Sequence, residues 1–436
     1  MMTMPSVSKA AAFRAKVFDR RARERAADWL AVAVAVSLPW STTATSVLII
    51  LWLVAVLPTL DVAALKRELF TAAGGLPVAL WVLGGLGLFW ADVSWSDRIA
   101  GYSSFYRFLA IPVLLAQFRR SEHGMRVLVG FLAAVTAVLL LSWLLVLFPA
   151  LPWHPAQYGV PVKDYILQSG DFLMCAFVLF ALAIDESCAR RYRLAIGLLA
   201  LAFLFLANIA FVTTARTTLL VAPVLAVLLG WRYFRWRGLL GAALVFAVLG
   251  GVAALEAPYL RTRLNTSLNE LHAYEARDAL NSTSVHLQFL KESFSFMATA
   301  PVIGHGTGSI QEQFRKAAAG RTGPQGVASI NPHDQILAVG IQLGLIGIAV
   351  LIAMWAAHFM LFPGPGLTAW IGIVVVTQNV VASLVNSHLF DFTQAWLYIF
   401  GVGVTGGMAL RERDRAVAAQ QAKRYESRLE NHPATA

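Results

Sequence analysis

Residues 338–355 read AVGIQLGLIGIAVLIAMW and contain no charged side chain. A run of this composition is long enough to cross a bilayer as one helix, which takes roughly 17–25 residues. Of the 436 residues, 58% are hydrophobic and only 14% are charged, whereas a soluble domain carries about 25% charged residues. The sequence therefore predicts an integral membrane protein.

Comparable apolar runs recur along the whole chain and predict an all-α polytopic protein with about 12 membrane spans. They cover residues 28–41, 43–60, 76–92, 102–118, 125–149, 166–184, 194–213, 216–231, 238–256, 335–361, 366–388 and 393–410. The expected organisation is a basic N-terminus (1–27), nine spans (28–256), a helical domain outside the membrane (257–333), three spans (334–410) and a basic tail (411–436).

The distribution of Lys and Arg predicts the orientation of these spans. They gather at the N-terminus, in the even-numbered connections and in the tail, while the short odd-numbered connections hold almost none. The positive-inside rule then places both termini in the cytoplasm and residues 257–333 on the outer side. The net charge of +11 is thus a topology signal. We expect no nucleic-acid binding, because the charges are divided among short loops without stacking aromatics.

The outer segment 257–333 is predicted to contain three helices. The apolar face expected on the first is formed by Leu260, Leu264, Leu268 and Leu271. Ser282 or Ser284 is expected to cap the second. The side chains expected on its buried face are Leu287, Leu290, Phe294 and Met297. A short third helix follows a glycine turn. This domain has too little apolar surface to fold alone and is expected at the membrane boundary.

The stretch before the quoted helix, ASINPHDQIL (328–337), carries a candidate general base. Asn331 is expected as N-cap, Pro332 as the first helical residue and Asp334 as the third, in a capping box. His333 would then lie in the first turn, where the helix dipole disfavours the imidazolium and keeps the ring neutral. The alternative is an interfacial histidine that hydrogen-bonds to lipid headgroups. Asp334 is expected to cap the helix rather than to act in catalysis.

A candidate anion site lies at the start of another span, in TTARTTLLV (213–221). Arg216 is expected at the same outer face as His333, with Thr213, Thr214 and Thr217 beside it. A guanidinium and free backbone N–H groups at a helix N-terminus suit a phosphate. The alternative is an arginine that extends to lipid phosphate. Together, Arg216 and His333 suit attack by a hydroxyl with departure of a phosphate or pyrophosphate from a lipid-linked donor.

Other residues are weaker candidates. The stretch GHGTGS (304–309) lacks the lysine of a P-loop, so we expect a turn between helices, with His305 a turn residue. Arg107 is expected near the outer end of the fourth span, where it could line the same cavity. Asp391 could orient His333 or a sugar, or could cap a helix at Thr393. The outer domain contains three further arginines, Arg261, Arg263 and Arg277. They could supply a second phosphate-binding group, called here the second clamp, or they could simply form a charged face.

No cofactor or catalytic metal is expected, since the outer loops carry no DxD-type acidic pair. Both cysteines are expected to be reduced, because Cys175 lies in an apolar run and Cys188 in a basic loop, with no Cys/His cluster near either.

Four features together resemble the O-antigen ligase family and its relatives, the O-antigen polymerases and protein O-oligosaccharyltransferases. They are ART at the outer start of a span, the large outer loop, PVIGHGTGS within that loop, and PHDQIL at the following helix. The resemblance implies a GT-C-like fold in the bacterial inner membrane. It also implies inverting transfer of a glycan from undecaprenyl pyrophosphate at the periplasmic face, without nucleotide or metal.

The same resemblance implies roles for particular residues. His333 would act at the acceptor hydroxyl, and Arg216 would bind pyrophosphate. This chain departs from the family pattern at two places: Asp334 follows the histidine where the family usually has Asn, and His286 stands near the usual position of a second arginine. His286, Arg263 or Arg277 would then supply the second clamp.

The sequence is interpreted as a ligase that transfers O-antigen to a sugar hydroxyl of lipid A-core. The nearest alternative is an O-antigen polymerase with the same chemistry and a glycan acceptor. A protein O-oligosaccharyltransferase is disfavoured by the short tail. A lipid-linked oligosaccharide flippase or transporter, the alternative of another class, predicts polar residues at mid-membrane depth and related halves, which we do not find in the sequence.

Overall fold

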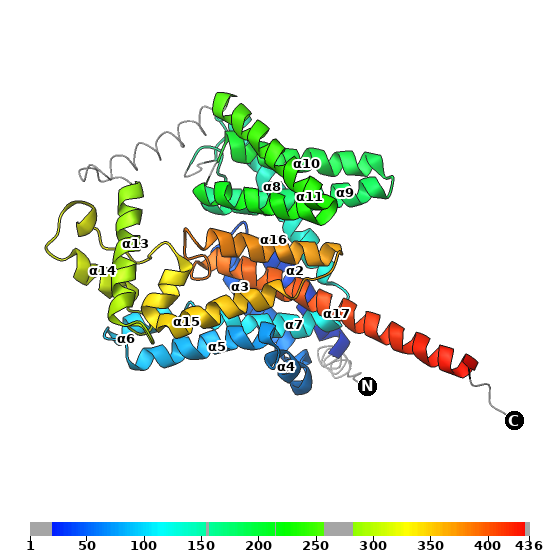
Figure 1. Ribbon diagram of the computed structural model, residues 1–436, viewed down its shortest axis with the longest axis horizontal. Helices are drawn as coiled ribbons and strands as arrows, with labels where there is room; N and C mark the ends of the chain where they lie inside the picture. The colour runs from blue at the N-terminus through cyan, green and yellow to red at the C-terminus, as the bar shows by residue number, and fades with distance from the viewer. Residues whose placement is uncertain (1–19, 154–156, 214, 257–281, 432–436) are drawn as a thin grey trace, which may run out of the picture.

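The computed structural model describes residues 20–153, 157–213, 215–256 and 282–431 (Figure 1). These residues form helices joined by loops and contain no β-strand, only an isolated bridge between Gln157 and Val160. The predicted all-α class is confirmed. Both cysteines are free, with Cys175 buried and Cys188 exposed.

Within the described residues, eight segments are long and apolar enough to cross a membrane. They comprise α3 (Thr42–Val56) with the 3-10 turn after it, α5 (Ala72–Leu86) with its 3-10 turn, Trp95–Arg120, α8 (Gly124–Leu147), α9 (Tyr165–Cys188), α10 (Tyr192–Phe211), Arg216–Gly238 and α15 (Gln335–Phe359). A ninth apolar helix, α16 (Leu367–Ala382), is shorter. The protein is therefore a multi-pass membrane protein.

Several boundaries differ from the sequence prediction. Helix α2 (Arg20–Ser37) begins within the basic N-terminal segment. The fourth span is interrupted, since it consists of α6 (Trp95–Tyr102), a 3-10 turn (Tyr106–Leu109) and α7 (Ala110–Arg120). Helix α16 ends at Ala382, six residues early, which leaves a loop over 383–391. Helix α17 (Phe392–Asn431) continues through most of the charged tail.

The long helix α11 (Arg216–Glu256) contains the reversal expected between the eighth and ninth runs. Its backbone leaves the helical region at Arg235, with φ 53° and ψ −136°. The two limbs fold back on each other (Figure 1). A Cβ on Gly230 would lie 2.5 Å from the carbonyl oxygen of Gly238, so the absence of a side chain at Gly230 permits this close approach.

The starts of α9, α11 and α15 meet the C-terminal end of α16 at one end of the bundle, which we call the site end. Thr218 of α11 donates to Ser169 of α9 at 3.0 Å. The side-chain amide of Gln378 of α16 donates to the carbonyl of Gly170 at 3.0 Å. The N–H of Gln335, at the start of α15, donates to the carbonyl of Ser383 at 2.8 Å. The start of α11 and the start of α15 therefore lie at the same end, as the sequence predicted.

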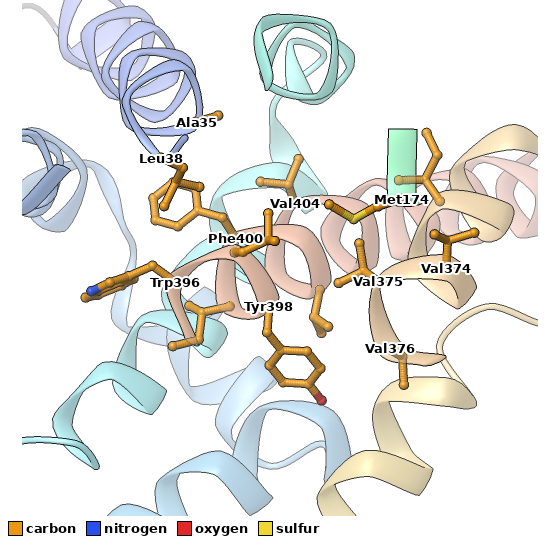
Figure 2. Packing of buried hydrophobic residues seen from close by; sticks show 14 of the residues in the cluster. Ala35, Leu38, Met174, Val374, Val375, Val376, Trp396, Tyr398, Phe400 and Val404 are labelled. Carbon is orange, nitrogen blue, oxygen red and sulfur yellow. The ribbon is translucent and has the colours of Figure 1, made fainter. Parts of the chain in front are cut away.

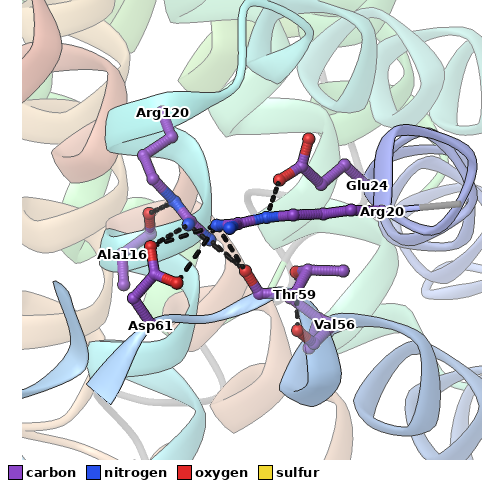
Figure 3. Close-up of polar contacts among 7 residues, drawn as sticks. All are labelled: Arg20, Glu24, Val56, Thr59, Asp61, Ala116 and Arg120. Atoms are coloured by element: carbon purple, nitrogen blue, oxygen red, sulfur yellow. Dashed lines mark hydrogen bonds and ion pairs between the residues drawn. The ribbon is translucent and has the colours of Figure 1, made fainter. Parts of the chain in front are cut away.

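Ion pairs gather at the opposite end, called here the basic end. Figure 3 shows Arg20 and Arg120 beside Asp61 and the carbonyl of Thr59. Arg119 joins α7 to Asp414 of α17 at 2.7 Å, and also to Glu68 of α4 (Val62–Leu69) at 3.1 Å. In Figure 1, α4 and the far half of α17 lie at the end away from α6 and α13.

Between the two ends the helices share one apolar core. Figure 2 shows Leu38 just after α2, Met174 of α9, Val375 of α16 and Phe400 of α17 in this core. Trp52 of α3 is fully buried, and its indole N–H donates to the side chain of Gln117 on α7 at 2.8 Å. The indole N–H of Trp52 thus finds its partner on a neighbouring helix, which stabilises a buried polar group in a membrane.

The outer domain contains the second and third predicted helices, α13 (Ser282–Thr299) and α14 (Ile310–Ala318). The predicted buried face of α13 is only partly correct: Met297 packs against the buried cluster of the outer domain, but two of the other predicted residues are exposed. Leu290 and Phe294 are 38% and 57% exposed, whereas Phe289 is buried against Phe314 of α14. The face is rotated because α13 packs on both α14 and α15. The first predicted helix, Leu260–Leu271, lies outside the described residues.

The glycine stretch 304–309 is a docking turn, in agreement with the turn interpretation. The N–H groups of His305 and Gly306 donate to the carbonyls of Ile341 and Gln342, at 2.8 and 2.9 Å. Thr307 bonds to the carbonyls of Gly87 and Gly84. These backbone donors are committed to protein carbonyls, so the loop holds the outer domain onto α5 and α15 and does not cradle phosphate.

Candidate active site

The residues before α15 do not form the predicted capping box. Asp334 itself is the N-cap, with φ −152°, and its side chain accepts the N–H of Leu337 at 2.9 Å. His333 lies outside the helix with φ +58°. The side chain of Asn331 accepts the N–H of His333 at 2.9 Å, which closes an Asx turn. The predicted capping role of Asp334 is confirmed, but the predicted places of Asn331, Pro332 and His333 in the helix are wrong.

The turn directs the imidazole of His333 against α13. Its ring centroid lies 4.4 Å from that of His286, at an interplanar angle of 73°. It also stacks on Phe289 at 6.0 Å, with an interplanar angle of 12°. His333 is half-buried. The outer domain therefore forms one wall of the site, and His286 is an immediate neighbour of the candidate base.

The imidazole of His333 is neutral near pH 7. Burial lowers its pKa from 6.5 to about 4, with a further contribution from His286, while a side-chain hydrogen bond with Asn386 acts in the opposite direction. The sequence predicted the neutral ring but assigned it to the helix dipole. Since His333 precedes the helix, partial burial and the second histidine are the physical cause.

The loop 383–391 forms the second wall, which the sequence analysis did not predict. The hydroxyl of Ser387 donates to the side chain of Asn331 at 2.6 Å. The side-chain oxygen of Asn386 accepts the N–H of Ser387 at 2.9 Å. Asn386 and Ser387 thus hold the turn that carries His333. The polar letters NSH (386–388), at the end of the predicted run 366–388, were the available signal.

Arg216 is the first residue of α11 and is exposed at the site end. Beside it, Thr213 is 2% exposed and its hydroxyl has no hydrogen-bond partner among the described residues. A guanidinium, a helix N-terminus and an unmatched hydroxyl suit the oxygens of a phosphate group. Arg216 at the start of α11 and His333 just before α15 therefore lie at the same end of the bundle.

Two other predicted residues hold the loop 383–391 in place. Arg107 is buried and donates to the backbone carbonyl of Asp391 at 2.8 Å, with its guanidinium 5.3 Å from the ring centroid of Phe392. The carboxylate of Asp391 accepts the N–H of Gln394 at 3.0 Å and so caps α17, one of the two roles that the sequence left open. We infer a positioning role for Arg107 and Asp391.

Lys163 is a cation at the site end that the sequence analysis did not single out. Its backbone has φ +56°. Its ammonium group donates to the hydroxyl of Thr393 at 3.0 Å and contacts the carbonyl of Leu38. Burial lowers the pKa of Lys163, while Asp171, Asp391 and Asp164 raise it. The candidate clamp residues Arg261, Arg263 and Arg277 lie outside the described residues.

Asp334→Ala is expected to lower the free energy of unfolding by about 1 kcal/mol, because it removes the N-cap of α15. Asp334→Asn keeps an acceptor at the cap and is the matched control. Thermal unfolding of both variants in the same detergent tests this. Equal destabilisation by the two substitutions would show that the charge of Asp334, not its capping bond, stabilises the fold.

The depressed pKa of His333 also predicts a pH-dependent stability. Between its folded pKa of about 4 and its ordinary value of 6.5, the unfolded chain binds more protons than the folded one. Acidification from about pH 7 to about pH 5 should therefore destabilise the fold. We expect His333→Gln to show a smaller drop in melting temperature over this interval than the unsubstituted chain. An equal drop in both proteins would contradict this assignment.

The fold and the site define a multi-pass membrane protein whose polar site lies at one end of the bundle, beneath a helical outer domain. Residues 201–352 match the family described as O-Antigen ligase. The matched segment contains Arg216, His286 and His333. This match agrees with the resemblance seen in the sequence motifs. The matched family implies glycosyltransferase-like activity in O-antigen assembly, with lipid-linked polysaccharide and lipid A-core as the general partners. No curated protein matches the chain.

Proposed function

We propose that this protein is an O-antigen ligase. It transfers the glycan of undecaprenyl-pyrophosphate-linked O-antigen to a sugar hydroxyl of lipid A-core at the periplasmic face of the bacterial inner membrane. The observation that carries the proposal is the neutral imidazole of His333, held outside its helix at the end of the bundle where α11 begins with Arg216. Both residues lie in the segment that matches the family.

In the proposed reaction, the acceptor oxygen attacks the anomeric carbon of the donor sugar. A ring nitrogen of His333 takes the hydroxyl proton as the new C–O bond forms. The bond between the anomeric carbon and the pyrophosphate oxygen breaks, and undecaprenyl pyrophosphate leaves with the electron pair. One displacement on the face opposite the leaving group inverts the anomeric centre.

Asn386 supports this role for His333. The hydrogen bond between Asn386 and His333 raises the pKa of the imidazole. An oxygen of Asn386 that accepts a ring N–H would have this effect. The partner of a histidine ring decides which nitrogen stays free to act as base. A pyrophosphate bound near Arg216 would raise the pKa of His333 from about 4 toward neutrality. That shift would make the ring a better base when the donor is present.

Arg216 would stabilise the charge that develops on the leaving pyrophosphate. Its guanidinium can form two parallel hydrogen bonds to phosphate oxygens, and the positive end of the helix dipole at the start of α11 adds to their effect. His286 is the only residue among the predicted second-clamp candidates that lies within the described chain. When protonated, it would supply positive charge beside His333.

Purified full-length protein, reconstituted in liposomes with lipid-linked O-antigen and lipid A-core, tests the proposal. We expect a glycan-bearing lipid A-core product without added nucleotide and in the presence of EDTA. Failure to form product from both pure lipids would overturn the assignment. A requirement for a divalent metal would overturn the metal-independent mechanism.

A deletion strain separates ligase from polymerase. Lipopolysaccharide that consists of core alone supports the ligase, whereas core carrying one repeat identifies a polymerase. A strain that accumulates donor only on the cytoplasmic leaflet would identify a transporter.

A further inference from the structure

A polar cavity lies at the basic end of the bundle, opposite the candidate active site. It holds about 360 Å³, within the range of roughly 300–1,000 Å³ typical of ligand sites. Its walls come from the first two turns of α2, the 3-10 turn after α3, the end of α7 and the loop 121–123. Six of its eleven lining residues carry a formal charge. The cavity therefore suits a charged ligand rather than an apolar one.

Two of the carboxylates in the walls are matched by neighbouring side chains. Asp28 is 7% exposed, and it accepts the side-chain amide of Gln117 at 2.9 Å and the hydroxyl of Ser121 at 2.6 Å. Glu24 accepts the guanidinium of Arg20 at 3.1 Å. A bound cation would have to compete with these partners.

The third carboxylate is matched as well, and the balance of charge around the cavity is positive. Glu122 pairs with Arg411 and Arg415 of α17. The cavity lining and its ion-pair partners together contain six arginines and four carboxylates. A cavity with this excess of positive charge attracts an anion.

Three guanidinium groups line the cavity from two sides. Arg21 and Arg25 lie one turn apart on α2, and Arg120 is the last residue of α7. Figure 3 shows the guanidinium of Arg120 beside the carbonyl of Thr59, to which it donates at 3.2 Å. Guanidinium groups match the oxygens of a phosphate in pairs. A phosphate between α2 and α7 can therefore bond to arginines from both walls.

The cavity lies at the level of the lipid headgroups, because three membrane-spanning segments begin or end at its walls. The spans Thr42–Thr59 and Trp95–Arg120 both end at a lining residue. The next span begins at Gly124, directly after the lining residue His123. The phosphate closest to hand at this depth is that of a phospholipid.

Exposed apolar side chains adjoin the cavity. Trp29 lies one turn after Arg25 on α2 and is 59% exposed, and the guanidinium of Arg126 lies 5.5 Å from the centroid of its ring. Leu57, two residues before Thr59, is 50% exposed. Trp and Arg are typical of the membrane interface. The acyl chains of a lipid can therefore lie against Trp29 and Leu57 while its phosphate enters the cavity, a gain that a soluble phosphate would not have.

We propose that this cavity binds the phosphodiester headgroup of an anionic phospholipid from the leaflet at the basic end. Arg25 and Arg120 donate to the phosphate oxygens, and the acyl chains cover Trp29 and Leu57. The distribution of Lys and Arg predicts that this end faces the cytoplasm, where anionic lipid attracts basic segments. Binding involves no transfer reaction and lies opposite the candidate active site, so it does not depend on the proposed ligase activity.

Photo-crosslinking of the full-length protein in phosphatidylcholine nanodiscs tests the site. The probes are anionic phosphatidylglycerol and zwitterionic phosphatidylethanolamine with the same diazirine-bearing acyl chain, and labelled peptides are identified by mass spectrometry. We expect the phosphatidylglycerol probe to label residues 26–32 and 54–60 at least about fivefold more than the other probe, the effect of about one arginine near an anionic lipid. Added salt should reduce this preference.

The double variant Arg21→Gln with Arg25→Gln removes two cations from the α2 wall. Labelling of the two segments by phosphatidylglycerol should fall about fivefold or more, to the level of phosphatidylethanolamine. Both arginines are exposed, so the fold should remain intact, and thermal unfolding checks this. The matched control is Arg193→Gln with Arg237→Gln, which removes two exposed arginines from the same end of the bundle outside the cavity. It should keep the preference.

Equal labelling by the two probes would overturn the proposal. A preference that survives Arg21→Gln with Arg25→Gln, or that the control variant loses equally, would show a general attraction of the basic end and would also contradict it. Displacement of the phosphatidylglycerol probe by inorganic phosphate as effectively as by unlabelled phosphatidylglycerol would assign the cavity to a soluble anion instead of a lipid.

Discussion

His333→Ala is expected to reduce the initial rate of glycan transfer in the reconstituted assay by at least about 10²-fold, within the ~10²–10⁴ supplied by a positioned acid or base. The substitution removes the proton acceptor for the attacking hydroxyl. It leaves the N-cap of α15 in place, because Asp334 caps that helix, so the variant should fold and insert normally.

His305→Ala is the matched control for this variant, since it makes the same substitution in the outer domain. The ring of His305 is hydrogen-bonded to the backbone carbonyl of Phe296 at 2.9 Å, within the outer domain. Most of the activity should remain. Near-normal transfer by His333→Ala would remove the imidazole from the mechanism and leave positioning of the two lipids as the source of the rate.

Arg216→Ala is the second variant with a large expected effect, a loss of about 10²–10³-fold in kcat, the usual result of removing one donor to a developing oxyanion. The guanidinium would act most strongly as charge collects on the leaving pyrophosphate. kcat should therefore fall more than KM rises. Arg216→Lys keeps the charge but loses the bidentate geometry, so it should restore only part of the activity.

Arg237→Ala is the matched control for Arg216→Ala. Arg237 is also exposed, but it lies past the reversal of α11 at Arg235, at the other end of the first limb. Its removal should leave transfer unchanged. If Arg216→Ala raised KM for the donor with no change in kcat, Arg216 would bind pyrophosphate equally in the ground state and would not stabilise its departure.

The spans could be predicted from the sequence because each was decided by its own composition. Helix α8 covers Gly124–Leu147, against a prediction of 125–149, and α10 covers Tyr192–Phe211, against 194–213. A membrane helix satisfies its backbone hydrogen bonds internally, so an uninterrupted apolar run is nearly sufficient to define it. The break in the helix over 95–120 was missed because residues at the break contact a distant loop: Phe105 packs on Phe390, and Arg107 donates to the carbonyl of Asp391.

The local geometry of the candidate site could not be predicted in the same way. A proline and two capping residues favoured a helix start at Asn331, yet the Asx turn at Asn331 holds His333 outside α15. The bond between Ser387 and Asn331 stabilises this turn. Ser387 belongs to a loop that the sequence assigned to the end of a span, so this partner could not be foreseen.

The glycine stretch illustrates the same limit. GHGTGS is compatible with an anion cradle or with a turn, and its letters alone do not distinguish them. The carbonyls of Gly87, just after α5, and of Gln342 on α15 accept its N–H groups. Contacts with elements distant in the chain thus decided between the two roles.

By itself, the sequence determined that the chain is all-helical and crosses a membrane many times, and it placed Arg216 and His333 at the starts of their spans. Such features follow from the hydropathy of consecutive residues. Only the tertiary structure decided that His286 and Asn386 flank His333 and that the apolar face of α13 is rotated. These depend on which helices pack together, and packing brings into contact residues that no local pattern connects.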